Sequence, residues 1–168
     1  MFRRLVTAAL AATCLVSAPA QAQAPGLTPD EVGAIFCLSR TGDDPGVLSG
    51  LLTPGLAAVI AEAEAQDAAW AAANPGEKPP LGDGIPWQSV PDHVDTCRAD
   101  NVGWMMDEAT LDITYGFAGA PEITVKDRLH LRLVRTRPVE LPVWRIDNVR
   151  YDGGGDLRQV LTSAFLPN

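Results

Sequence analysis

The sequence predicts an α+β fold, in which N-terminal helices pack on a curved antiparallel sheet and a short helix follows at the C-terminal end. Three observations lead to this prediction. Helix start signals and an Ala-rich amphipathic segment occupy residues 28–74. Apolar residues recur at every second position between residues 110 and 151, which is the period of half-buried strands. A last apolar stripe at helical spacing follows the glycines at 153–155.

Residues 1–22 have the organisation of a secretory signal peptide. Arg3 and Arg4 precede an apolar run from Leu5 to Ala18, and overlapping A-x-A cleavage sites follow it. The run is shorter than the roughly 20 residues that a membrane span needs, so an uncleaved anchor is the less favoured alternative and no membrane anchor is expected. We therefore expect one domain at residues 23–168, in the periplasm or secreted.

The cysteines of the expected mature chain are Cys37 and Cys97, since Cys14 lies in the segment to be removed. An even number of cysteines in an oxidising compartment predicts one disulfide. Its closed loop of about 60 residues would stabilise the fold by roughly 4 kcal/mol. Two buried free thiols are the alternative. Because two isolated cysteines with His93 and His130 do not reproduce zinc-ligand spacing, no metal or other cofactor is expected.

The charge of the chain disfavours whole classes of partner. Without residues 1–22, which contain two arginines and no acidic residue, the formal net charge is −10 rather than −8. Such a chain repels nucleic acid and anionic lipid, so no nucleic-acid partner is expected. Residues 23–120 contain 3 basic and 15 acidic residues, whereas residues 121–168 contain 8 basic and 6 acidic. We expect acidic side chains of the helices and loops to pair with part of a basic sheet face.

Two helices are predicted in the first half. Residues 28–31 form a capping box, with Thr28 as the N-cap, and a buried stripe follows until the turn at 41–46. After a short apolar segment, VLSGLL, Thr53 and Pro54 repeat the start signal before an Ala-rich helix that ends at 74–76. The predicted buried residues are Val32, Ile35, Phe36 and Ser39 in the first helix, and Leu56, Val59, Ile60, Ala63 and Trp70 in the second.

Residues 74–101 are rich in Pro, Gly and Asp and are predicted to be a long loop, either ordered or unstructured. Loops of this length in a compact domain are usually functional or disordered. Trp87 is a candidate lid or binding anchor, and Asp92 and His93 are candidate polar groups of a site. For His93, a surface position in a turn is the favoured interpretation.

Three strands are predicted at Thr110–Ala118, Ile123–Arg137 and Trp144–Tyr151, with a further short one at residues 103–106. The second of these carries a basic stripe on one face, which could receive an acidic ligand or the acidic surface of a partner. Cross-strand pairing with Asp112 or Glu122, or simple solvation, is the favoured alternative. The basic stripe consists of Lys126, Arg128, His130 and Arg132.

The glycines at 153–155 lie between the last strand and a final helix, where Asp156 takes the N-cap position. A phosphate-binding loop would need a Lys and a Ser or Thr that this stretch lacks, and Asp152 and Asp156 would repel an anion. We therefore interpret the glycines as a hinge. The predicted buried face of the helix consists of Leu157, Val160, Leu161 and Ala164.

The C-terminal pattern Trp144-x-Ile146-Asp147-Asn148-Val149, followed by a glycine turn and Leu157-Arg158-x-x-Leu161, resembles the signature of a bacterial cell-envelope domain family of unknown function. That family belongs to the nuclear-transport-factor-two-like, cystatin-like superfamily. The resemblance implies a cone of helices around a bent sheet, with a pocket at the open end. Some relatives are isomerases or hydrolases and many only bind, so fold analogy does not choose between them.

Three functions are compatible with these residues. The favoured one is an exported, non-enzymatic domain that binds a small molecule, a peptide or an envelope protein through the sheet concavity and the 74–101 loop, with Trp87 and Trp104 as possible contacts. A pocket enzyme is the alternative, and it would need a buried carboxylate near Tyr115. Since Tyr115 is more simply a core residue with a satisfied hydroxyl, no catalytic residue is assigned. An inhibitor or immunity-like protein that masks a basic partner is the third function, and the chain could be a monomer or a homodimer.

Overall fold

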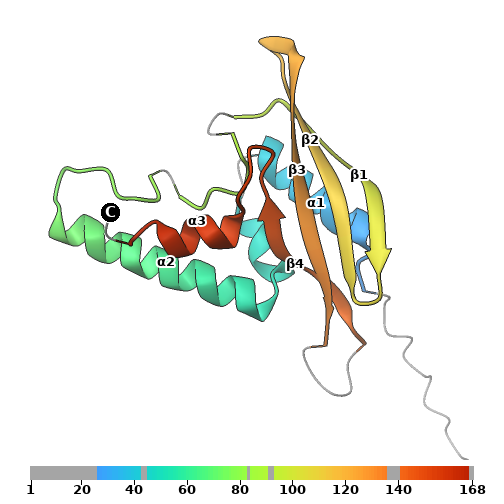
Figure 1. The fold of residues 1–168 in the computed structure, drawn as a ribbon, viewed down its shortest axis with the longest axis horizontal. Coiled ribbons are helices and arrows are strands. Elements are labelled where there is room, and N and C mark those ends of the chain that lie inside the picture. Colours follow the sequence, from blue (N-terminus) through green and yellow to red (C-terminus); the bar gives the residue numbers. More distant parts are fainter. Residues whose placement is uncertain (1–25, 43–44, 83, 91–92, 136–140, 167–168) are drawn as a thin grey trace, which may run out of the picture.

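The computed structural model describes residues 26–42, 45–82, 84–90, 93–135 and 141–166, so the predicted signal peptide and Asp92 lie outside the described residues. Its centre is a four-stranded antiparallel sheet with the strand order β1-β2-β3-β4 (Figure 1). The α+β prediction is confirmed, because helices pack against this curved sheet and a short helix follows it. The strands are β1 (Thr96–Met105), β2 (Glu108–Phe117), β3 (Ala120–Val134) and β4 (Val143–Arg150).

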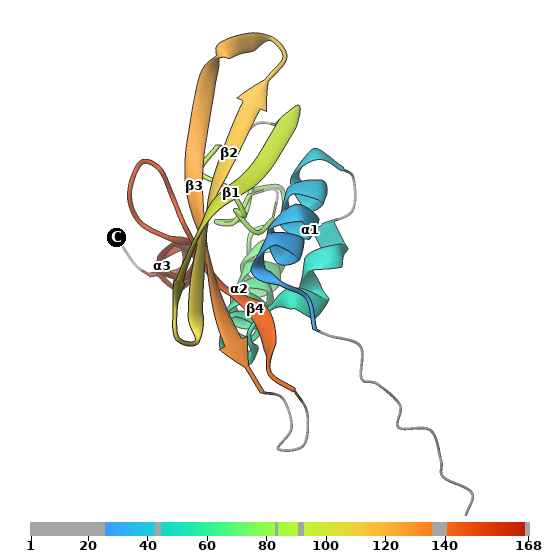
Figure 2. The same cartoon turned by 90° about the vertical axis from the view of Figure 1, so that its right-hand side faces the viewer.

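Helix α1 (Pro29–Thr41) packs on one face of the sheet, against β1 and β2 (Figure 2). Its predicted capping box is present, since Thr28 and Glu31 exchange hydrogen bonds between side chain and backbone. Gly33 allows the close approach to the sheet, because a Cβ at this position would lie 2.7 Å from the Leu111 side chain and 2.8 Å from Ala99. The apolar segment after α1 forms the short 3₁₀-helix η1 (Pro45–Leu51).

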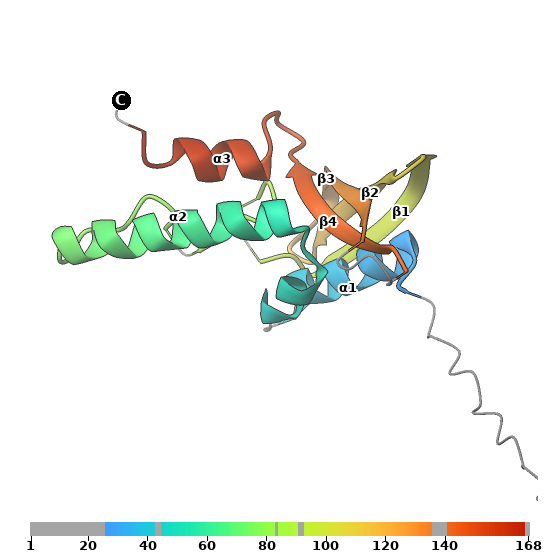
Figure 3. The same cartoon turned by 90° about the horizontal axis from the view of Figure 1, so that it is seen from below.

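Helices α2 (Pro54–Ala73) and α3 (Leu157–Ser163) lie side by side and extend away from the sheet beyond β4 (Figure 3). Thr53 and Asp156 cap them, as predicted. The carboxylate of Asp147 on β4 joins the two helix starts, because its Oδ1 accepts hydrogen bonds from Thr53 Oγ1 and Arg158 Nη2, both at 2.8 Å. Three residues of the C-terminal pattern, Asp147, Asn148 and Arg158, thus have a structural role, since Asn148 Oδ1 accepts from the Arg158 backbone.

The loop prediction for residues 74–101 is wrong at its C-terminal end. Thr96–Asn101 are the first part of β1, and the short strand predicted at 103–106 is its continuation. The alternating pattern was not visible in the sequence because β1 is an edge strand and its register shifts between Asp100 and Gly103, where Asn101 has φ +53°. Met106 lies in the following turn, at φ +51°.

The predicted core positions are largely confirmed. Val32, Phe36 and Ser39 of α1 are buried, and Ile35 is half-buried. In α2, Leu56, Ile60 and Ala63 are buried, whereas Val59 and Trp70 are half-buried. Trp70 belongs to the second half of the helix, which extends beyond the sheet. Leu157 and Leu161 anchor α3 in the core.

Candidate functional site

The segment between α2 and β1 is ordered in its described part and is held to the sheet by one buried carboxylate. Asp127 on β3 is 2% exposed. Its Oδ2 accepts a hydrogen bond from the backbone N–H of Ser89 at 2.8 Å, and its Oδ1 accepts one from the backbone N–H of Asp152 at 3.0 Å. The hydroxyl of Tyr151 also donates to the carbonyl of Pro86. These contacts fix the described residues of the 81–90 loop, namely 81–82 and 84–90, near Arg40 at the end of α1.

Two adjoining cavities lie beneath this loop and open to solvent. The first has a volume of about 450 Å³ and lies between Arg40, Lys78 and the loop. The second has a volume of about 620 Å³ and lies between the loop and the first half of α2, where Ile60 lines it. Both volumes fall in the range of about 300–1,000 Å³ that is typical of small-molecule sites. The residues that line both cavities are Arg40, Gly84, Ile85 and Trp87.

Arg40 lies at the C-terminal end of α1 and is the charged group common to both cavities. Its Nε donates a hydrogen bond to Ser39 Oγ at 3.1 Å, and its guanidinium lies over the Phe36 ring, 5.7 Å from the ring centroid. Burial lowers the pKa of Arg40, although arginine stays protonated in proteins. The structure thus places a half-buried positive charge between the two cavities.

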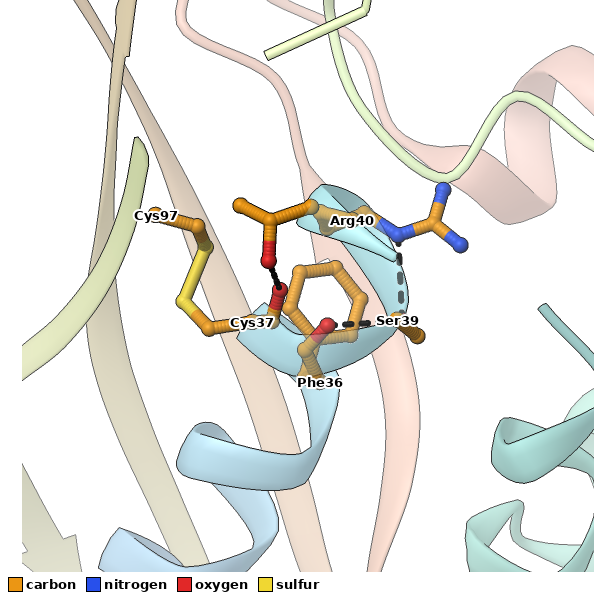
Figure 4. Close-up of a disulfide and its surroundings, with 6 residues drawn as sticks. Phe36, Cys37, Ser39, Arg40 and Cys97 are labelled. Atoms are coloured by element: carbon orange, nitrogen blue, oxygen red, sulfur yellow. Dashed lines mark hydrogen bonds between the residues drawn. A yellow bond between two sulfur atoms is a disulfide. The ribbon is translucent and has the colours of Figure 1, made fainter. Parts of the chain in front are cut away.

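The predicted disulfide between Cys37 and Cys97 is confirmed and joins α1 to β1. Figure 4 shows this bond on one side of α1 and the Arg40 side chain extending on the other side. The disulfide holds the two elements together, with a Cα–Cα distance of 5.1 Å. It therefore supports the helix end from which Arg40 reaches the cavities.

Tyr115 is fully buried in the core, as its structural interpretation predicts. Burial, and then the nearby negative charge of Asp127, raise the pKa of Tyr115 well above its ordinary value. The sequence predicts that the Tyr115 hydroxyl forms a hydrogen bond. This prediction is wrong, because Tyr115 Oη has no hydrogen-bond partner among the residues that the structure describes. The carboxylate that a pocket enzyme would need thus exists beside Tyr115, but both of its oxygens accept backbone hydrogen bonds.

The structure separates the other candidate residues. Trp87 of the 81–90 loop is buried at 8% exposure, whereas His93 is exposed. Trp104 lies near the far end of β1, where its ring meets Trp144 edge to face with centroids 5.2 Å apart. Trp104, Met105 and Met106 form an exposed apolar group at the β1–β2 turn. Trp87 and Trp104 therefore do not belong to one site.

The basic stripe of β3 engages the neighbouring strand. Arg128 forms an ion pair with Asp112 at 2.9 Å, which confirms the predicted cross-strand pairing, and Arg132 pairs with Glu108 at 2.8 Å rather than with Glu122. Lys126 is exposed. Burial, and then the charge of Arg128, lower the pKa of His130. The sequence predicts that acidic side chains of the helices and loops pair with this basic face. For Arg128 and Arg132 this prediction is wrong, because both pair with acidic residues of β2.

Two residues that sequence reasoning missed define the site. Asp127 is in phase with Leu129 and Leu131 on the apolar side of β3, and a carboxylate at such a position is a signal of a buried polar contact. Arg40 is one of only three basic residues in residues 23–120. Its position beneath the loop could not be inferred because it depends on the fold of residues 81–90.

No protein-family model, curated protein or solved structure matches the chain. In the described part, no group of three or more His, Cys, Asp or Glu side chains is placed to hold a metal ion. None of the described helices combines the length and the apolarity that crossing a bilayer requires.

Proposed function

We propose that the protein is an exported, non-enzymatic binding domain that takes a small molecule in the two cavities beneath the 81–90 loop. The observation that carries this proposal is the clamped loop. Asp127 holds Ser89 and Tyr151 holds Pro86, so the wall of the cavities is formed before any ligand arrives. A preformed wall reduces the entropy cost of binding.

Export is supported by the Cys37–Cys97 disulfide, because such bonds persist mainly in oxidising compartments. The predicted signal peptide at residues 1–22 fits the same location. We also propose a relation to the nuclear-transport-factor-two-like superfamily, on the C-terminal pattern at residues 144–161.

A binding function is favoured over a pocket enzyme by the environment of Asp127, the one buried carboxylate beside Tyr115 among the described residues. A general base must reach a proton of the substrate. Asp127 is 2% exposed and its two oxygens hold the Ser89 and Asp152 backbones. Its geometry is that of a structural clamp, so no catalytic role is proposed for it.

The test uses the neutral dye Nile red and the oxidised mature chain. Ala61 is exposed on α2 and lines the larger cavity, so Ala61→Trp should fill the cavity without disturbing the core. Ala65→Trp is the matched control, because Ala65 is exposed on the same helix and lines neither cavity. We expect dye fluorescence to rise with the wild type and with Ala65→Trp, and to fall at least fivefold with Ala61→Trp. Equal fluorescence of the two variants would refute binding in this cavity.

A further inference from the structure

We infer that the cavities beneath the 81–90 loop select a small carboxylate with an apolar body, and that the guanidinium of Arg40 binds its carboxylate group. The inference rests on the proposed binding function and names the chemical class of its ligand. Two features carry it: the distribution of charge around the cavities and the unfilled hydrogen-bonding capacity of Arg40.

The charge distribution is uneven in favour of an anion. Residues 23–120 contain 15 acidic residues and only three basic ones, Arg40, Lys78 and Arg98. Two of the three, Arg40 and Lys78, line the smaller cavity, and no acidic residue is among its described lining. Glu64 is the one acidic residue in the described lining of the larger cavity. Lys78 has a further interaction of its own, so the preference for an anion rests on Arg40 alone. In a chain with a strong negative charge, the Arg40 guanidinium makes its surroundings the favourable place for a negatively charged group.

The guanidinium of Arg40 is positioned but not neutralised. Its contacts with Ser39 Oγ and the Phe36 ring fix its orientation. Among the described residues, no carboxylate lies within ion-pair distance of it, and its Nη1 and Nη2 have no hydrogen-bond acceptor. A half-buried charge without a partner is costly, and a carboxylate matches the two parallel N–H groups of the guanidinium. A bound carboxylate would therefore supply the missing partner.

The apolar body of the ligand follows from the larger cavity. Ile60 of α2 and Ile85 and Trp87 of the loop line this cavity, and it shares Arg40 with the smaller one. A molecule can thus place an alkyl chain or a ring against these side chains while its carboxylate reaches Arg40. A single guanidinium suits a monoanion, since a phosphate dianion would call for more donors.

The test compares octanoate with octanamide, which has the same chain length and no charge, as competitors of Nile red. We expect octanoate to displace the dye from the wild type at a concentration at least tenfold lower than octanamide, because a charge-assisted bidentate contact has about that effect on affinity. Arg40→Gln should abolish the preference, and Arg40→Lys should restore part of it. Arg98→Gln is the matched control for net charge, because Arg98 is exposed on β1 and pairs with Asp100.

The outcomes separate the inference from the function on which it rests. If the dye binds in the cavity and octanoate and octanamide compete equally, the ligand class is wrong and the binding function stands. If octanoate is preferred equally by the wild type and Arg40→Gln, the anion binds elsewhere and the role of Arg40 is refuted. If Ala61→Trp leaves dye binding unchanged, the proposed function fails first. Should Arg40→Gln not fold, the comparison of acid and amide on the wild type still decides the ligand class.

Discussion

The Asp127 clamp can be tested by replacing one oxygen atom. In Asp127→Asn, the amide retains one acceptor oxygen and turns an N–H₂ group toward the backbone N–H of Ser89 or Asp152. One charge-assisted hydrogen bond, worth about 1.5–3 kcal/mol, is lost, and an unpaired buried donor adds to the cost. Removal of a buried charge offsets part of it. We expect the free energy of unfolding to fall by about 2–3 kcal/mol, which corresponds to roughly 6–9 °C in Tm for a domain of this size.

Urea unfolding gives the global change, and amide hydrogen exchange locates it. The amides of Ser89 and Asp152 should exchange roughly 30-fold faster in Asp127→Asn, because their acceptors are weakened. Asp95→Asn is the matched control, since Asp95 Oδ2 accepts from the backbone N–H of Ala118 at 2.6 Å on the surface. This variant should stay within about 0.5 kcal/mol of the wild type. The clamp would be refuted if Asp127→Asn matched this control in both measurements.

Two further predictions concern the disulfide and the basic stripe. Protein recovered from the periplasm should lack about 22 N-terminal residues. Cys37 and Cys97 should resist alkylation until the protein is reduced, and reduction should lower the free energy of unfolding by about 4 kcal/mol. Alkylation of these cysteines before reduction would contradict the disulfide. NMR titration should give His130 a pKa below 6.5, and Arg128→Gln should raise this pKa by removing a positive charge. The pKa of His130 is lower in the folded chain than in the unfolded chain. The contribution of His130 to stability is therefore complete above the unfolded pKa of about 6.5. It is lost as the pH falls through the folded pKa, because the unfolded chain binds the proton first. A His130 pKa at or above 6.5 in the folded wild type would contradict this reasoning.

The fold could be predicted from the sequence wherever local signals and burial agree. The caps at Thr28, Thr53 and Asp156 satisfy backbone groups within a few residues, so their chemistry is visible without the fold. The strands β2 and β3 alternate because each has one buried face. The first part of β1 lacks this pattern, since the strand lies at the sheet edge and its position depends on contacts with β2 and on the bond to Cys37.

The candidate site was less accessible to sequence reasoning, because its contacts join distant segments. Asp127 meets Ser89 across 38 residues, and Tyr151 meets Pro86 across 65. Trp87 could be selected as a large aromatic residue in a loop of turn-forming residues. Arg40 resembled an ordinary C-terminal helix residue, which interacts favourably with the helix dipole at any exposed helix end. Its importance arises only from the loop that covers it.

The bond between Cys37 and Cys97 closes a covalent ring, and every described residue that lines the two cavities lies within residues 40–90, inside that ring. The strands β2, β3 and β4 and the helix α3 lie outside it. The segment that lines the two cavities is thus a macrocycle attached to the sheet at one covalent junction. A single proteolytic cut in the 74–95 segment would open this ring but release no fragment, so the two pieces would stay joined wherever the compartment keeps the disulfide oxidised.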